Sequence, residues 1–371
     1  MVATCTYLAA PPFIMHELQE VNLVRPDILL TAQSVCSFRP GSSYVQAFGN
    51  IYHSGCFKCA ACSNAIPGNM RFNIHENEPY HPQCFQELYH PRCSVCDERL
   101  PMTPDGRITY LEMPFWQLKY CALHEQRDRC CSCRRIEPTA RSKHFQSLSD
   151  GRKLCGDCTN TVVIDTEEVQ PVVLDVWAFL ASLGMHLPEV PVFLVDFETL
   201  NAQSHTAHLN LPRDSKTPVV YGVCLSEVVQ FNHFAHRAIQ KLFRLENTRR
   251  VNGIMILHGL PYDMTAYILA HEATHAYFKL HEGFPTSLPP KVEEGMCQLM
   301  GYLYLQYRKV MAPEDEPQFL KQLRDWYLQS LVEDASPIYG DGLRDALHSF
   351  NLYNSLQNVL DHIRQASAFP E

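Results

Sequence analysis

The sequence predicts an α+β protein whose N-terminal and C-terminal halves are stabilised in different ways. Fourteen of the 16 cysteines lie before residue 160, mostly in C-x-x-C pairs, which indicates modules built around metal ions. The remaining sequence combines short apolar, β-branched runs with longer segments of helical periodicity, which indicates a mixed sheet packed against helices. A chain of 371 residues is too long for one ordinary core, so we expect several domains.

Composition and charge exclude some classes of protein. The net charge is −9 and there is no long basic run, so the chain lacks the charge pattern of a nucleic-acid-binding protein. No apolar run approaches the roughly 18 residues of an ordinary membrane-spanning helix. Residues 1–15 have no Lys or Arg before their apolar residues and contain Pro11-Pro12, unlike a signal peptide. We therefore expect a reducing compartment, the cytoplasm with the nucleus as a second location, where C-x-x-C pairs hold zinc.

Residues 1–32 show no sustained periodicity and are expected to form a poorly ordered tail. From 33 to 88 the spacing is that of a LIM zinc-binding domain, in which two ligands on a tight turn and two more after a loop surround one ion. The first site has three visible ligands, because Gln33 stands where the fourth is expected. Either Cys5 or a water molecule is the fourth ligand, or this site holds no metal. The expected ligands are Cys36, His53 and Cys56 in the first site and Cys59, Cys62, His81 and Cys84 in the second.

From 89 to 160 we expect a LIM-like zinc-binding domain with two further sites. Zinc substitutes here for a hydrophobic core that about seventy residues can barely build, so its role is folding. Cys131 is a surplus thiol, or it exchanges with Cys130 as a ligand. The predicted ligands are Cys93, Cys96, Cys121 and His124 in one site and Cys130, Cys133, Cys155 and Cys158 in the other. The sequence thus predicts three or four structural zinc ions.

Residues 161–371 contain an H-E-x-x-H motif inside a helical segment that extends from 263 to 280. On a helix this motif places His271 and His275 one turn apart on one face, with the Glu272 carboxylate beside them. Glu294 follows His275 after 18 residues, the spacing of a gluzincin peptidase, and is the expected third ligand. Two histidines and one carboxylate leave a tetrahedral zinc ion one open position, which is typical of catalytic zinc.

The predicted chemistry is zinc-assisted peptide hydrolysis, with Glu272 as the general base. Glu293 is an alternative ligand, but the spacing and the following Gly295 favour Glu294; Glu293 then orients a histidine or faces solvent. Tyr339 is the candidate donor to the oxyanion, beside the alternative of a purely structural tyrosine.

The remaining elements are predicted from local patterns. We expect strands at 190–195, 218–225 and 253–257, and helices at 176–187, 315–332 and 342–364. Residues 244–250 are expected to form a solvated loop. Strand 253–257 precedes the H-E-x-x-H helix, so it is either the sheet edge on which an extended substrate pairs or an ordinary interior strand.

The order of the modules, with residues 269–276 and 292–298, resembles the plant growth-limiting LIM-domain metallopeptidases, the DA-one family. The supporting stretches are 129–133, 150–155, 224–227 and 334–342, so the resemblance covers roughly 33–371. It implies an intracellular endopeptidase that is activated by ubiquitin and cleaves regulators of cell proliferation. The sequence departs from this pattern at Gln33 and in the short N-terminal tail, where no ubiquitin-interacting helix is visible.

Two classes of function are therefore expected from the sequence. The first is a zinc endopeptidase with one catalytic ion, protein substrates and ubiquitin or ubiquitylated proteins as partners. The second is a non-catalytic LIM scaffold, or a ubiquitin- or peptide-binding adaptor, with a peptidase-like fold. The complete ligand set and base favour the enzyme, because a pseudoenzyme usually lacks one of them.

Overall fold

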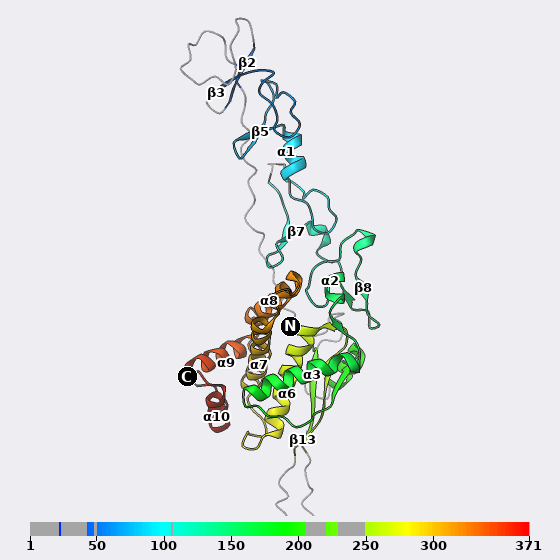
Figure 1. Cartoon of the computed structure of the whole chain (residues 1–371), viewed down its shortest axis with the longest axis vertical. Coiled ribbons are helices and arrows are strands. Elements are labelled where there is room, and N and C mark those ends of the chain that lie inside the picture. The colour runs from blue at the N-terminus through cyan, green and yellow to red at the C-terminus, as the bar shows by residue number, and fades with distance from the viewer. Residues whose placement is uncertain are drawn as a thin grey trace, which may run out of the picture. The chain divides into compact units, whose positions relative to one another are not determined.

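A computed structural model describes residues 22–23, 43–47, 50–104, 107–204, 220–228 and 249–370 (Figure 1). The predicted α+β class is confirmed. Contacts divide the chain into two compact units. Of the described residues, those up to 127 and 138–140 form the N-terminal unit, and 128–137 together with those from 141 onward form the C-terminal unit. The segment predicted as a LIM-like domain, 89–160, is thus divided between the two units.

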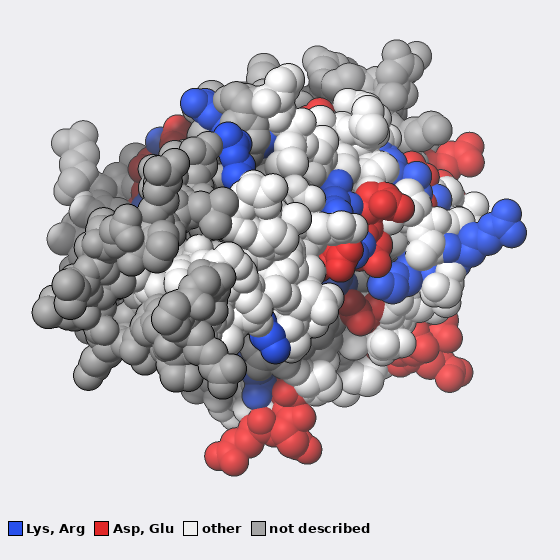
Figure 2. Space-filling view, turned by 90° about the horizontal axis from the view of Figure 1, so that it is seen from above, with Lys and Arg blue, Asp and Glu red and all other residues white. Residues whose placement is uncertain are grey.

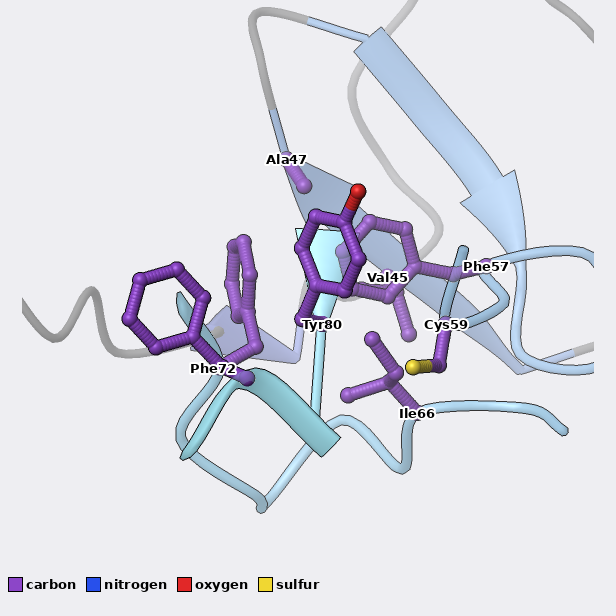
Figure 3. Close-up of a cluster of buried hydrophobic side chains, with 8 residues drawn as sticks. Val45, Ala47, Phe57, Cys59, Ile66, Phe72 and Tyr80 are labelled. Carbon is purple, nitrogen blue, oxygen red and sulfur yellow. The ribbon is translucent and has the colours of Figure 1, made fainter. Parts of the chain in front are cut away.

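The N-terminal unit is a series of short antiparallel hairpins with very little regular structure between them. Its elements are β1 (Asn22–Leu23), β2 (Tyr44–Ala47), β3 (Asn50–His53), β4 (Asn73–His75), β5 (Glu78–Tyr80), α1 (Pro82–Tyr89), β6 (Leu111–Met113), β7 (Leu118–Tyr120) and a 3-10 turn, Ala122–His124. A cluster of eight buried residues forms the core of the first module (Figure 3). Phe57 and Phe72 meet edge to face in it, with ring centroids 5.1 Å apart. So small a core is consistent with stabilisation by metal ions.

The C-terminal unit contains a three-stranded mixed sheet covered by long helices (Figure 1). Its first elements are β8 (Gln146–Ser147), β9 (Lys153–Leu154), α2 (Gly156–Thr159), β10 (Val162–Val163), α3 (Thr166–Ser182), β11 (Val192–Val195), α4 (Phe197–Ser204), β12 (Gly222–Val228), β13 (Arg249–Leu257) and β14 (Leu260–Pro261). The helices that follow are α6 (Tyr262–Leu280), α7 (Pro290–Met311), α8 (Gln318–Val332), α9 (Gly340–Tyr353) and α10 (Leu356–Ala366).

The strand order corrects one of the two interpretations of 253–257. β13 lies between β11 and β12, parallel to β11 and antiparallel to β12, so it is the interior strand and cannot offer an edge to a substrate. β13 also begins earlier than predicted, because Arg249 and Arg250 pair with β12 instead of belonging to a loop.

Helix α6 has the limits that the sequence predicts, and it is largely buried. α7 packs along it and is crossed closely by α9. The crossing depends on two glycines, since a Cβ on Gly295 would lie 2.5 Å from the carbonyl oxygen of Gly342. This close approach brings the start of α9 to the part of α7 that carries Glu294.

Two predicted helices have other limits in the structure. The helix expected over 342–364 is divided into α9 and α10, because Asn354 takes a left-handed conformation with φ 49° and the Ser355 side chain caps the next helix. The helix expected over 176–187 is the second half of α3, which begins after the Asp165 cap and ends at Ser182. Among the helices described, none is long and apolar enough to cross a membrane.

Candidate functional site

Two helices of the C-terminal unit bring the predicted zinc ligands together. His271 and His275 lie one turn apart on α6, with ring centroids 5.1 Å apart. Glu294 reaches both of them from α7: its Oε2 atom is 3.2 Å from Nε2 of His271 and 3.4 Å from Nε2 of His275. The three predicted ligand atoms therefore converge on one point.

The environment of Glu294 fits a bound cation. Its Oε2 atom is buried and, despite the two nearby nitrogens, has no well-directed hydrogen-bond partner. Burial alone would raise the pKa of this carboxyl, but the two histidines lower it well below its usual range, so it is ionised. Two imidazole nitrogens and a carboxylate oxygen facing each other are the donors of a zinc site.

Glu293 has a different role from Glu294. Its Oε1 atom lies 3.0 Å from Nδ1 of His275 and 3.1 Å from Nζ of Lys279. With Nδ1 hydrogen-bonded to this carboxylate, Nε2 of His275 faces Glu294 and is free to bind an ion. Of the two alternatives for Glu293, the structure therefore favours orientation of a histidine.

The predicted base, Glu272, lies between α6 and the sheet and is only 7% exposed. Burial raises its pKa, which suits a carboxylate that must accept a proton near neutral pH. It faces β12, where the backbone of Cys224 hydrogen-bonds to it. A Cβ on Gly222 of the same strand would lie 2.7 Å from Cγ of Glu272, so only glycine leaves room for this carboxylate.

Tyr339 directly precedes α9, and the charges of Glu294, His275 and Glu272 all act on its hydroxyl. Burial raises its pKa, so the phenol stays protonated and can donate a hydrogen bond. The structure thus places this predicted residue within electrostatic reach of Glu294, His275 and Glu272.

Cys297 is a residue of the site that the sequence patterns do not identify. It lies on α7, fully buried, and its sulfur lies within 4.8 Å of a ring nitrogen of His271 and of His275. Its position one turn after Glu294 was the available signal, because residues three apart share a helix face. The C-x-x-C patterns draw attention to the N-terminal half instead.

The predicted cysteine sites form three further clusters, each with four donors close enough to share one ion. Thiolates and imidazoles in such tetrads are typical ligands of structural zinc. The clusters are Cys59, Cys62, His81 and Cys84; Cys93, Cys96, Cys121 and His124; and Cys130, Cys133, Cys155 and Cys158. Cys131 lies outside the third cluster as the surplus thiol, and burial raises its pKa to about 12.

The first turn of each cluster has the same backbone geometry. The residue after the second cysteine has a positive φ in all three, at Ser63, Asp97 and Arg134. In each cluster the first cysteine sulfur also accepts a backbone N–H bond from a later ligand: from His81 to Cys59, from Cys121 to Cys93 and from Cys155 to Cys130. Such bonds stabilise the thiolate that zinc requires.

The incomplete first LIM site is only partly covered by the structure. Cys36, Cys5 and Gln33 lie outside the described residues. His53 and Cys56 are close together, with Nδ1 and Sγ 3.9 Å apart. The predicted ways to complete this site, by Cys5, by water or without a metal, therefore stay predictions.

The third cluster, Cys130 to Cys158, is built into the C-terminal unit. Ser132 shares a buried hydrogen bond of 2.6 Å with Tyr327 of α8. Arg135 donates to the sulfurs of Cys133 and Cys155 at 3.2 and 3.1 Å, and its guanidinium lies over the ring of Phe319. This cluster therefore packs against α8, which in turn packs against α7, the helix that carries Glu294.

The surface carries no segregation of charge in the view of Figure 2. Lys and Arg side chains are interspersed with Asp and Glu over the described part of that face. The site itself is defined by buried groups, not by a charged surface.

Comparison with known proteins shows similarity over most of the chain. The family described as "DA1-like: Protein DA1" matches residues 183–366, and the LIM domain family matches 36–88, which confirms the predicted LIM domain. Protein DA1-related 1 and Protein DA1 of Arabidopsis thaliana are each 33% identical over 88% of this chain. LIM domain-containing protein HDR3 of Oryza sativa subsp. japonica is 33% identical, and the match covers 71% of that protein. The chain spans 64% and 65% of the two Arabidopsis proteins.

Proposed function

Because the chain belongs to the family of DA1-like proteins, we propose that it is a zinc-dependent endopeptidase of the gluzincin type that acts in the control of growth. The observation that carries the proposal is the convergence of His271, His275 and Glu294 beside the buried carboxylate of Glu272. This combination provides both a metal-binding set and a base, which a merely structural zinc site does not need.

Each residue of the site has a defined task in this proposal. His271, His275 and Glu294 would hold the ion, which when bound acidifies water and polarises a carbonyl group. Glu272 accepts the proton of the attacking water and delivers it to the leaving amine. Tyr339 donates a hydrogen bond to the oxygen that becomes negative in the transition state.

The substrate is expected to bind along β12. This strand lies beside Glu272, and no strand among the described residues pairs with the side of β12 that faces away from β13. An extended peptide can add to such an edge through backbone hydrogen bonds, which would place its scissile bond next to the base. β12 thus takes the role that one interpretation of the sequence gave to β13.

The proposed substrates are proteins that regulate cell proliferation, and ubiquitin or ubiquitylated proteins are the proposed partners. Support for these comes from the resemblance to growth-limiting LIM-domain metallopeptidases. The alternative is a non-catalytic scaffold or adaptor that uses the same fold to bind partners.

The test is cleavage of a peptide library prepared from a proteome, with new N-termini identified by mass spectrometry. We expect cleavage by the zinc-loaded protein, and a loss of at least 100-fold in rate for Glu272→Gln, which keeps the size of the side chain but cannot accept the proton. Glu282→Gln, a change of an exposed glutamate just after α6, is the matched control and should cleave normally. Equal cleavage by Glu272→Gln and wild type would contradict the mechanism, and no cleavage by any zinc-loaded form would favour the scaffold.

A further inference from the structure

Cys297 is a thiol inside the candidate metal site that the three-ligand set leaves without a role. The sulfur and one ring nitrogen each of His271 and His275 lie within 4.8 Å of one another, and the side chain is fully buried. Zinc–sulfur bonds of about 2.3 Å and zinc–nitrogen bonds of about 2.0 Å would keep such donors roughly 3.5 Å apart. Small shifts of side chains are therefore enough for these donors to share one ion.

We propose that Cys297 is a fourth protein ligand of the ion held by His271, His275 and Glu294, and that it closes the metal site in the resting protein. The inference rests on the metal site of the proposed function. A site with four protein ligands has no open position, so peptide cleavage would require the sulfur to leave the ion.

The ring of His275 has three close polar partners, one of which is the Cys297 thiol. Nδ1 of His275 already faces the Glu293 carboxylate, and Nε2 faces Oε2 of Glu294. A thiol that only hydrogen-bonded to this ring would compete with one of the two carboxylates. A cation held by the two histidines could contact the sulfur and the Glu294 oxygen as well, which accounts for the presence of both donors beside the histidines.

Because Cys297 and Glu294 share α7, the protein could change between a set of three ligands without the sulfur and a set of four ligands with it. Glu294 and Cys297 lie one turn apart on α7, and each of them lies close to His271 and His275. When the sulfur binds, the thiol releases its proton to solvent and the sulfur–metal bond forms. When it leaves, the bond breaks, the sulfur regains a proton from solvent and one position opens for water.

The experiment is cobalt replacement in the full-length chain. A short treatment with chelator removes the most weakly held ion, one equivalent of Co²⁺ is added, and the near-ultraviolet absorption is recorded for wild type, Cys297→Ser and Cys224→Ser. Sulfur bound to Co²⁺ gives a charge-transfer band, and subtraction cancels the contribution of the shared cysteines. We expect a band in wild type minus Cys297→Ser and none in wild type minus Cys224→Ser, the control thiol on β12.

Two further measurements separate the possible failures. Suppose that wild type and Cys297→Ser give equal spectra and that His271→Ala binds one equivalent of Co²⁺ less. This result would overturn the proposal that Cys297 is a fourth ligand and leave the proposed function intact. Unchanged Co²⁺ binding in His271→Ala would contradict the metal site itself. If Cys297→Ser does not fold, ¹¹³Cd NMR is recorded for the wild type after its most weakly held ion is replaced by one equivalent of Cd²⁺. A resonance in the range of cadmium bound only to nitrogen and oxygen overturns the inference.

Discussion

At the scale of single residues, Glu293 and Glu294 show how neighbouring carboxylates take separate tasks. Glu294 points between the two histidine Nε2 atoms, whereas Glu293 binds the opposite nitrogen of His275 and the ammonium of Lys279. Adjacent residues on a helix point about 100° apart, so one of them faces the ion while the other supports its ligand from behind.

We predict that Glu293→Ala weakens metal binding without abolishing it. Loss of the carboxylate leaves Nδ1 of His275 without its oriented partner, and changes of this kind typically cost 10- to 100-fold in metal affinity. Zinc affinity can be measured by competition with a fluorescent chelator. Glu314→Ala, at an exposed position after α7, is the control. Wild-type affinity in Glu293→Ala would mean that the contact is incidental.

Gly222→Ala should reduce catalysis while metal binding stays normal. The added methyl would lie 2.7 Å from Cγ of Glu272 and 2.8 Å from Cγ2 of Ile268, so the base must move although the ligands need not. Displacement of a catalytic group by about 1 Å can cost about 100-fold in rate. Cleavage rate and zinc content are measured on the same sample. Gly55→Ala, where a Cβ has nothing within 4 Å, should match wild type in both.

The residues that the sequence predicts are those defined by local spacing. His271, Glu272 and His275 are fixed by helix periodicity, and the C-x-x-C pairs by their tight turns. Gly222 contributes through a contact with a segment far away in the chain, which no local pattern reveals. The spacing of Cys297 from Glu294 places it on the same helix face, but it does not show that this face lies against the two histidines. Tyr339 could be proposed only as one of 17 tyrosines, because its place depends on the crossing of α7 and α9.

At the scale of elements, a buried ion-pair network fixes the first turn of α6. Arg324 of α8 is 2% exposed; its Nε donates to Asp263 of α6 at 2.7 Å, and its Nη1 donates to Glu316 at 3.1 Å. Arg308 of α7 also reaches Asp263 at 3.3 Å. The helix that carries the H-E-x-x-H motif is therefore anchored to two others at its N-terminal end.

Arg324→Met is expected to destabilise the C-terminal unit by about 3–5 kcal/mol, because it leaves two buried carboxylates without their main partner. The free energy of unfolding can be measured in urea by the fluorescence of Trp177 and Trp326, which lie in this unit. The control is Lys309→Ala, which breaks an exposed pair with Asp325 at 2.7 Å between α7 and α8. That change should cost less than about 1 kcal/mol. Similar losses for both variants would contradict the importance of burial.

The elements themselves differ in how far their sequences define them. The limits of α6 follow from its apolar periodicity and the Gly-Pro-containing segment after it, and the structure agrees. The position of β13 in its sheet does not follow from its own residues, since an apolar strand can be central or at an edge. The break between α9 and α10 depends on one left-handed residue, Asn354, in an otherwise continuous helical pattern.

At the scale of the whole molecule, the zinc clusters do not all belong to the same unit. Two of them lie in the N-terminal unit, whereas the third lies in the C-terminal unit and packs against α8 through Ser132 and Tyr327. Tyr327 in turn lies against Tyr267 of α6, with ring centroids 5.7 Å apart, one turn before His271. Arg152, from the loop between the cysteine pairs of this cluster, donates to the carbonyl of His258 at 2.6 Å, just before α6 begins.

We therefore predict that loss of the third cluster loosens the candidate active site, whereas loss of a cluster in the N-terminal unit does not. Cys158→Ser removes one of the four buried donors of the third cluster, and Cys62→Ser removes one of the four donors of the cluster in the LIM domain. Zinc binding at such sites is part of the folding free energy, so each change should be felt within its own unit. Hydrogen exchange followed by mass spectrometry reports this segment by segment. For Cys158→Ser we expect faster exchange in α6 and α8, and for Cys62→Ser only in residues 57–89. If α6 keeps wild-type protection in Cys158→Ser, the third cluster is an independent module, and its contacts with Tyr327 and His258 do not stabilise α6.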